Sequence, residues 1–227
     1  MTTYSHGQEF TEYLRPTDAI DCGSPEVLQF ANDRSGSRST DVDRAIALYY
    51  AVRDEFRYDP YRLDLTLQGM RASSTLAKGF GFCIPKAVLL AASARALQIP
   101  SRLGFADVKN HLATEHLLEL MQTDLFVFHG YAELYLEGTW VKATPAFNKS
   151  LCERFNVEPL DFDGRNDSIL QQCDQAGNQF MQYVRDRATF ADLPIDEILA
   201  AFIEHYPALA SEEADDLAGS FDGEVAT

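Results

Sequence analysis

The sequence predicts an α+β fold in which helices come first and antiparallel strands follow. Apolar residues recur at helical spacing between residues 41 and 97, and the periodicity changes to two after Pro100. The chain has 227 residues, of which 46% are apolar and 11% aromatic, so it can bury one domain with or without an appended subdomain. Helices and strands that are segregated along a chain are typical of the α+β class.

Charge and cysteine content make several function classes poor candidates. The net charge is −16 and no Lys/Arg-rich patch is present, which argues against nucleic acid and anionic membranes as partners. The four cysteines show no CxxC pair, so neither a zinc site nor a disulfide framework is expected, and no cofactor is implied. The N-terminus lacks a signal-peptide pattern and no run reaches the length of a membrane span, so we expect a cytoplasmic protein.

The first eighty residues predict two helices between loops. We expect a short strand over residues 9–14, a brief helix over residues 25–31, and a longer helix from residue 41 to about residue 58, capped by Thr40 or Asp41. Residues 61–78 are expected to form a surface loop. No nucleophile elbow surrounds its Ser73-Ser74-Thr75, so these hydroxyls are interpreted as loop and capping groups.

The segment GFGFCIPKAVLLAASARALQIP, residues 79–100, predicts an apolar helix with a cysteine at its start. Pro85 suits the first turn, and Ile99-Pro100 ends the helix. Cys83 then lies at the positive end of the helix dipole, where the pKa of a thiol is lowered and the nucleophilic thiolate is favoured. The alternative is that Cys83 is a buried apolar residue, as most free cysteines are.

The second half of the chain predicts a sheet and then an irregular extension. Strands are expected over residues 101–107 and 114–121, followed by an apolar run at 125–128 and a hairpin over 129–143 that turns at Glu137-Gly138. Beyond residue 148 we expect a loop-rich stretch over 149–176, helices over 175–188 and 195–205, and a disordered acidic tail. The predicted units are an N-terminal extension (1–40), a core (41–148), a C-terminal extension (149–210) and the tail (211–227).

His129 is the candidate base for a thiol mechanism, which needs a base and a group that orients it. With the turn at Glu137-Gly138, His129 lies opposite Ala146 and diagonal to Thr144, roughly 7 to 8 Å away. Glu133 shares the face but lies about 13 Å along the same strand. A register shifted by one residue would instead present Ala143, Pro145 and Phe147, none of which could act.

The remaining histidines have weaker patterns. His111 and His116 are five residues apart and match no helical metal pair, so no metal site is predicted from them. His6 and His205 are expected to be solvated at the periphery.

Three blocks of the sequence resemble the transglutaminase-like superfamily, whose papain-related core occurs in transglutaminases, bacterial transglutaminase-like proteases and peptide N-glycanases. They are AIALYYAVRDEFRY (45–58), STLAKGFGFCIPKAVLLAASARALQIPSRLGF (74–105) and FHGYAELYLEGTWVKATPAF (128–147). The resemblance implies that Cys83 is the nucleophile and His129 the proton shuttle. It also implies an orienting aspartate shortly after Trp140, and that position is occupied by Thr144.

Thr144 is a departure from the family pattern, because a hydroxyl could accept a hydrogen bond from imidazole but carries no charge to stabilise imidazolium. Asn148, Asp161 and Asp163 are the other nearby candidates for orienting His129. The resemblance thus implies a cysteine hydrolase or acyltransferase acting on a peptide or small amide through a thioester. The competing interpretation is a binding or scaffold protein that keeps the fold with a decayed triad, and a third is acyl transfer to a small amine.

Overall fold

The computed structural model describes residues 10–207, apart from 112, 172, 174 and 178, together with residue 221. His6 and the predicted disorder of the tail lie outside the described residues, except for Phe221. In order, the elements are η1 (Thr11–Tyr13), α1 (Pro25–Ser35), α2 (Asp41–Glu55), β1 (Arg57–Tyr58), α3 (Ala72–Lys78), β2 (Phe80–Gly81), α4 (Cys83–Ala96), β3 (Ser101–Asn110), α5 (Glu115–Met121), β4 (Leu125–Leu136), β5 (Thr139–Ala143), α6 (Lys149–Phe155), β6 (Met181–Phe190) and α7 (Ile195–His205).

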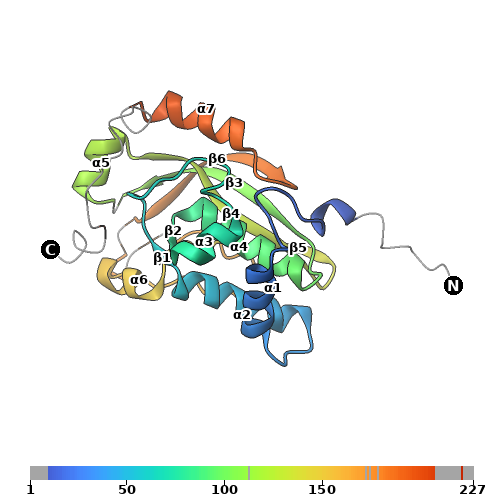
Figure 1. The fold of residues 1–227 in the computed structure, drawn as a ribbon. Helices are drawn as coiled ribbons and strands as arrows, with labels where there is room; N and C mark the ends of the chain where they lie inside the picture. Colours follow the sequence, from blue (N-terminus) through green and yellow to red (C-terminus); the bar gives the residue numbers. More distant parts are fainter. Residues whose placement is uncertain are drawn as a thin grey trace.

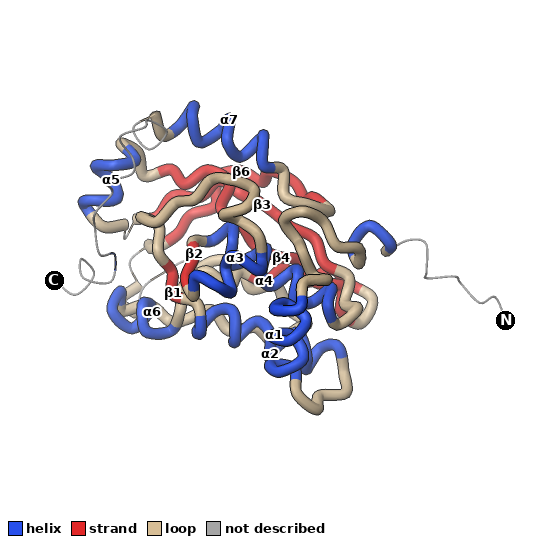
Figure 2. Tube along the Cα trace, viewed as in Figure 1, coloured by secondary structure: helices blue, strands red, loops and turns tan. Residues whose placement is uncertain are grey.

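A four-stranded antiparallel sheet in the order β5-β4-β3-β6 forms the centre of the fold. α4 packs against β4 and β3. In Figure 1, α1 and α2 lie below the sheet, while α7 lies above it, beyond β6 and β3. Figure 2 shows the long strands as a curved band between these helices. The α+β class predicted from the order of elements is confirmed.

The predicted helices before the sheet are confirmed, with small changes at their ends. The side chain of Ser24 accepts a hydrogen bond from the backbone N–H of Val27 at the start of α1. Thr40, rather than Asp41, caps α2 by accepting from the N–H of Asp43. α2 ends at Glu55, earlier than expected, because Phe56 already has an extended backbone that leads into β1.

α4 is buried along nearly its whole length, as its small and apolar residues predict. Two cations are buried on it as well. The ammonium of Lys86 donates to the backbone carbonyls of Arg53, Phe56 and Ala146 at 3.0, 2.6 and 2.7 Å. The guanidinium of Arg95 similarly donates to backbone carbonyls only, those of Arg15, Ser101 and Ala191. Both cations therefore tie the central helix to segments that are distant in the sequence.

The hairpin and its register are confirmed. Glu137 and Gly138 form the turn with positive φ angles of 48° and 93°, which suits the right-handed twist of a hairpin. Ala132 pairs with Ala143, as the predicted register requires. The ladder with β5 ends there, however, because the N–H of Thr144 donates to the carbonyl of Ser168. The predicted pairing of His129 with Ala146 is therefore wrong, and His129 pairs only on the other side of β4, with Ala106 of β3, among the described residues.

Two short predictions in the first half of the chain are wrong. Within the range predicted as a strand at 9–14, the described residues form the 3-10 helix η1. The range predicted as the loop 61–78 contains α3, which ends at Gly79 in the left-handed region, with a φ of 71°.

Residues 114–121 are a helix rather than a strand. Thr114 caps α5 by accepting from the N–H of Leu117, and Glu115 adds an acid in its first turn. Leu117 and Met121 are buried at a spacing of four. A short apolar run fits both the helical period of 3.6 and the strand period of two, and the cap at Thr114 favours the helix.

The C-terminal extension also differs from the prediction. A helix is predicted over residues 175–188, but residues 181–188 of that range belong to the strand β6 (Met181–Phe190), which pairs with the free edge of β3. β6 is an edge strand, and its exposed polar and charged residues are typical of such a position. The stretch 149–176, which is predicted to be rich in loops, begins with the helix α6. The helix predicted at 195–205 is confirmed as α7. No helix in the described ranges is long and apolar enough to cross a membrane.

Candidate active site

Cys83 is the first residue of α4, and its side chain is nearly closed off, with 8% of the residue exposed. Burial raises the pKa of the thiol to about 11, although backbone N–H groups of Gly130 and Ile84 act in the opposite direction. The expected lowering of the thiol pKa is therefore wrong for this conformation, because desolvation of the thiolate outweighs the favourable helix start.

His129 lies on β4 and approaches Cys83 because the next residue is glycine. A Cβ at Gly130 would lie 3.1 Å from Cα of Ile84, closer than most Cβ contacts, so glycine favours the close packing of β4 on the first turn of α4. His129 is 4% exposed. Burial lowers the pKa of its imidazole to about 4. The thiol and the imidazole are thus both neutral near pH 7 in this conformation.

Cys83 and His129 line the same cavity, whose volume is about 50 Å³. Its other walls are apolar or aromatic, and they comprise Tyr58, Pro60, Leu63, Phe82, Leu117, Met121, Phe126, Val127, Phe202 and Tyr206. No hydrogen bond joins the thiol to the imidazole among the described residues. The structure brings the predicted nucleophile and base to one apolar pocket.

Thr144 lies beyond His129, away from the cysteine pocket. His129 and Thr144 line a second, narrower gap, and His129 is the residue that borders both spaces. Within the described ranges, neither Nε2 of His129 nor Oγ1 of Thr144 has a hydrogen-bond partner, although both atoms are buried. The predicted proximity of Thr144 to His129 is thus found, but a hydrogen bond between them is not.

The alternative orienting residues are engaged elsewhere. Oδ1 of Asn148 accepts from the backbone N–H of Tyr58 at 3.0 Å, and its amide donates to Ser150. The side chain of Asp161 is 89% exposed and accepts from the hydroxyl of Tyr50. Asp163 accepts from the residues that follow it in its own turn, which lowers its pKa to about 2. None of the three lines the gap beside His129.

Sequence comparison agrees with this geometry. The sequence model of the transglutaminase-like superfamily matches residues 28–145, just over half of the chain, and this range includes Cys83, His129 and Thr144. The chain belongs to the transglutaminase-like superfamily. The papain-related α+β core inferred from the three sequence blocks is therefore confirmed. α6, β6 and α7 lie outside the matched range.

Two solved structures are similar to this chain at low sequence identity. A candidate cysteine protease from Cytophaga hutchinsonii is 18% identical, with a TM-score of 0.49, and the alignment covers 64% of this chain and 44% of that one. A candidate protease from Parabacteroides distasonis is 16% identical, with a TM-score of 0.38 and coverages of 52% and 23%. This chain thus spans less than half the length of either protein. No curated protein matches the chain significantly.

Sequence reasoning missed Asp107, a buried carboxylate that bonds to Phe128, the residue before His129. Asp107 lies on β3, 4% exposed, and accepts hydrogen bonds from the backbone N–H of Phe128 and from the guanidinium of Arg187 on β6. It holds the residue that directly precedes His129. A buried acid inside an apolar strand was the available signal in the sequence, but the pairing of β3 with β6 was not predictable.

Lys86 was also missed, although it lies one helical turn after Cys83. Burial lowers the pKa of its ammonium to about 7, whereas the three carbonyl acceptors match the three donors of the charged form. Its partner Ala146 also lines the gap beside His129. Lys86 thereby connects the cysteine helix with the segment that carries Thr144.

The C-terminal segment closes the cysteine pocket. Phe202 of α7 and Tyr206 contribute to its walls. The hydroxyl of Tyr206 accepts from the N–H of Val127 at 2.6 Å and donates to the carbonyl of Leu125 at 2.9 Å, which fixes it to the start of β4. The C-terminal segment therefore forms part of the wall around Cys83.

Truncating Phe202 is expected to expose the thiol. In a Cys173→Ser background, which removes the exposed thiol of the chain, Phe202→Ala should increase the rate of iodoacetamide alkylation of Cys83 several-fold at a fixed alkaline pH, because access to the pocket widens. The rate is measured by peptide mass spectrometry. Ile203→Ala is the control, since Ile203 is 62% exposed on the same helix. Equal rates in the two variants would contradict this account of pocket closure.

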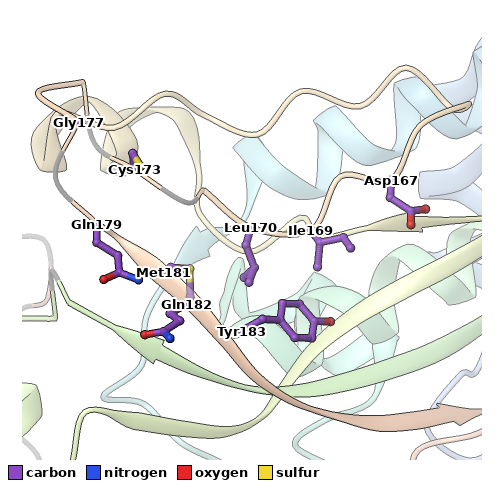
Figure 3. A pocket seen from close by; sticks show the side chains of 9 residues that line it. All are labelled: Asp167, Ile169, Leu170, Cys173, Gly177, Gln179, Met181, Gln182 and Tyr183. Atoms are coloured by element: carbon purple, nitrogen blue, oxygen red, sulfur yellow. The ribbon is translucent and has the colours of Figure 1, made fainter.

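A larger open pocket of about 620 Å³ lies between the segment after β5 and β6. Figure 3 shows Ile169, Leu170 and Tyr183 among the side chains that line it. It contains neither Cys83 nor His129, but Ile169 and Met181 separate it from the gap that His129 shares with Thr144.

Metal-ligating groups do not gather anywhere in the described ranges. No three His, Cys, Asp or Glu side chains there are arranged to hold a metal ion. His116 packs against the ring of Tyr61.

Proposed function

We propose that this chain is a transglutaminase-like cysteine enzyme that cleaves or transfers an amide or related acyl group through a thioester on Cys83. One observation carries the proposal: the thiol at the start of α4 and the imidazole of His129 line one apolar pocket. The substrate class is a peptide or small amide with an uncharged, apolar group next to the reacting carbonyl, because charged groups would lose their hydration in this pocket.

The two neutral groups define how the reaction starts. The thiol proton passes to the imidazole of His129 as sulfur attacks the carbonyl carbon, and a tetrahedral oxyanion forms. The backbone N–H of Cys83, at the helix start, is a candidate donor to that oxyanion. His129 then returns the proton to the leaving amine, which departs and leaves a thioester.

Water resolves the thioester in the second half of the reaction. His129 takes a proton from water as the oxygen attacks, the carboxylic acid is released, and the proton returns to the sulfur of Cys83. A small amine in place of water would give transfer rather than hydrolysis. We favour hydrolysis, since no feature of the described pocket provides a polar binding site for an amine.

Acyl trapping tests this function directly. The Cys173→Ser variant is incubated with the p-nitrophenyl ester of an N-acylated phenylalanine, quenched in acid and digested for mass spectrometry. The expected result is an acyl adduct on the Cys83 peptide, followed by turnover to free acid. Absence of an adduct on a folded protein, with this ester and with apolar peptide amides, would contradict the proposed function. Adding hydroxylamine or a primary amine then separates transfer from hydrolysis by the product.

A non-catalytic binding protein with the same fold is the second candidate. The feature that favours it is the buried Nε2 of His129, which has no hydrogen-bond partner in the described part of the chain. Burial lowers the pKa of this imidazole, and no neighbouring charge among the described residues offsets that effect to stabilise an imidazolium. In that case the apolar pocket would bind a ligand without acylation of Cys83.

Thr144→Asp is expected to restore a charged partner for His129. A carboxylate at this position faces the same gap as the imidazole, so it should raise the pKa of His129 above about 4 and increase the rate of acylation. The pKa is measured by NMR titration of the imidazole. Thr144→Asn adds a polar group without charge and should produce a smaller shift. An unchanged pKa in a folded Thr144→Asp protein would argue that the two side chains do not interact.

A further inference from the structure

A β-bulge directly precedes His129. Ala106 pairs with His129, whereas Val108 pairs with Phe126, so Val127 and Phe128 together oppose the single residue Asp107. Phe128 has a φ of 53°, in the left-handed region that non-glycine residues rarely adopt. Bulges change the direction of neighbouring side chains and occur often beside active sites. The direction of the His129 side chain therefore depends on this local conformation.

Asp107 holds the bulge in place. One oxygen of its carboxylate accepts the backbone N–H of Phe128 at 3.1 Å and also accepts the Nε–H of Arg187. The guanidinium of Arg187 lies 4.4 Å from the centre of the Phe128 ring. The strained residue is thus held through its backbone by Asp107 and through its ring by Arg187. Arg187 comes from β6, outside the range that matches the superfamily.

We propose that Asp107, held by Arg187, is a positioning residue that directs His129 toward Cys83 by fixing the bulge at Phe128. The expected effect on acylation of Cys83 rests on the proposed function, whereas the expected effect on the position of His129 does not. Asp107 does not border the cysteine pocket or the gap beside His129, so it acts through the backbone rather than as the missing third member of a triad. A segment outside the superfamily match thereby contributes to the geometry of the base.

The same two strands provide a matched control. Glu133 on β4 is also a buried carboxylate paired with an arginine, since Arg102 of β3 contacts it at 2.6 Å. Glu133 does not contact Phe128 or the bulge. Removing Glu133 therefore breaks an equivalent buried ion pair of the sheet without affecting the backbone next to His129.

The test compares Asp107→Ala, Asp107→Asn and Glu133→Gln in the full chain with Cys173→Ser. Two readouts are measured: the pKa of His129 by NMR, and the rate of acylation of Cys83 by the p-nitrophenyl ester. We expect Asp107→Ala to shift the pKa of His129 from about 4 toward its ordinary value of 6.5 and to lower the acylation rate about 10- to 100-fold, as misplacement of a catalytic group does. Asp107→Asn keeps an acceptor for the N–H of Phe128 and should retain most of both properties.

The outcomes separate this inference from a general structural role. A His129 pKa and an acylation rate that are unchanged in folded Asp107→Ala, or equally changed in Glu133→Gln, would overturn it. If Asp107→Ala does not fold, Arg187→Gln replaces it, and the same shift of the His129 pKa is expected in smaller measure; no shift would overturn the inference. If the parent protein is never acylated, the proposed function fails, and the His129 titration still decides the role of Asp107.

Discussion

Replacing Cys83 by serine is expected to lower the rate of acyl-enzyme formation by at least about 10³-fold. A serine hydroxyl is a much weaker acid than the thiol, and His129, whose pKa is held near 4 by burial, is a weak base for it. His129→Ala should lower the rate by about 10²- to 10⁴-fold, the usual contribution of a general base. The measurement is the rate of p-nitrophenol release under single-turnover conditions.

The double variant and the pH profile sharpen this prediction. The effects of substituting residues that act as one unit are not additive. The double variant Cys83→Ser with His129→Ala should therefore be acylated no more slowly than the slower of the two single variants. Because only neutral imidazole accepts the proton, the wild-type rate should fall as the pH drops through about 4 and stay level near neutrality. His116→Ala, which alters a histidine outside the pocket, is the control. A rate that survives Cys83→Ser would place the nucleophile elsewhere.

Replacing Lys86 by methionine is expected to lower the free energy of unfolding by about 3 kcal/mol or more, because three buried carbonyls would lose their donors. Methionine has a similar length, so the change removes the charge and the hydrogen bonds with little loss of volume. The loss is a large fraction of the net stability of a typical domain. Urea unfolding followed by circular dichroism measures the effect.

Lys78→Met is the matched control for this prediction. Lys78 lies at the end of α3, partly exposed, and its ion pair with Asp64 spans 2.9 Å. Pairs of this kind contribute roughly 0 to 1 kcal/mol. An equal loss of stability in the two variants would show that Lys86 has no special role in joining α4 to α2 and to the segment around Ala146.

The hairpin illustrates what a local pattern can predict. The turn residues Glu137 and Gly138 and the alternation on either side specify one register, and Ala132 pairs with Ala143 accordingly. The same pattern could not show where the pairing stops. Thr144 leaves the sheet because its N–H bonds to Ser168, a residue from the distant C-terminal extension. A long-range contact therefore ends the ladder between β4 and β5 at Ala143, although Thr144 still lines the gap beside His129.

The strand β6 and the helix α5 show the limits of short segments. Residues 114–121 fit both the helical and the strand period, and the hydrogen bond that the side chain of Thr114 accepts from the N–H of Leu117 favours a helix. Residues 181–190 mix strand-favouring and charged residues, and pairing with the free edge of β3 makes them a strand. Arg187 reaches Asp107 only through this pairing.

Periodicity, capping and turn residues act over a few positions, so the α+β class, the cysteine at the start of an apolar helix and the hairpin register could be predicted without the fold. Three blocks of the sequence indicated the superfamily. The electrostatics of the candidate site depend instead on how distant segments pack around it. Burial by β4, α5, α7 and Tyr206 keeps the thiol and the imidazole neutral, against the local effect of the helix start. Desolvation depends on every segment that packs around a group, and the segments that line this pocket lie between residues 58 and 206 of the chain.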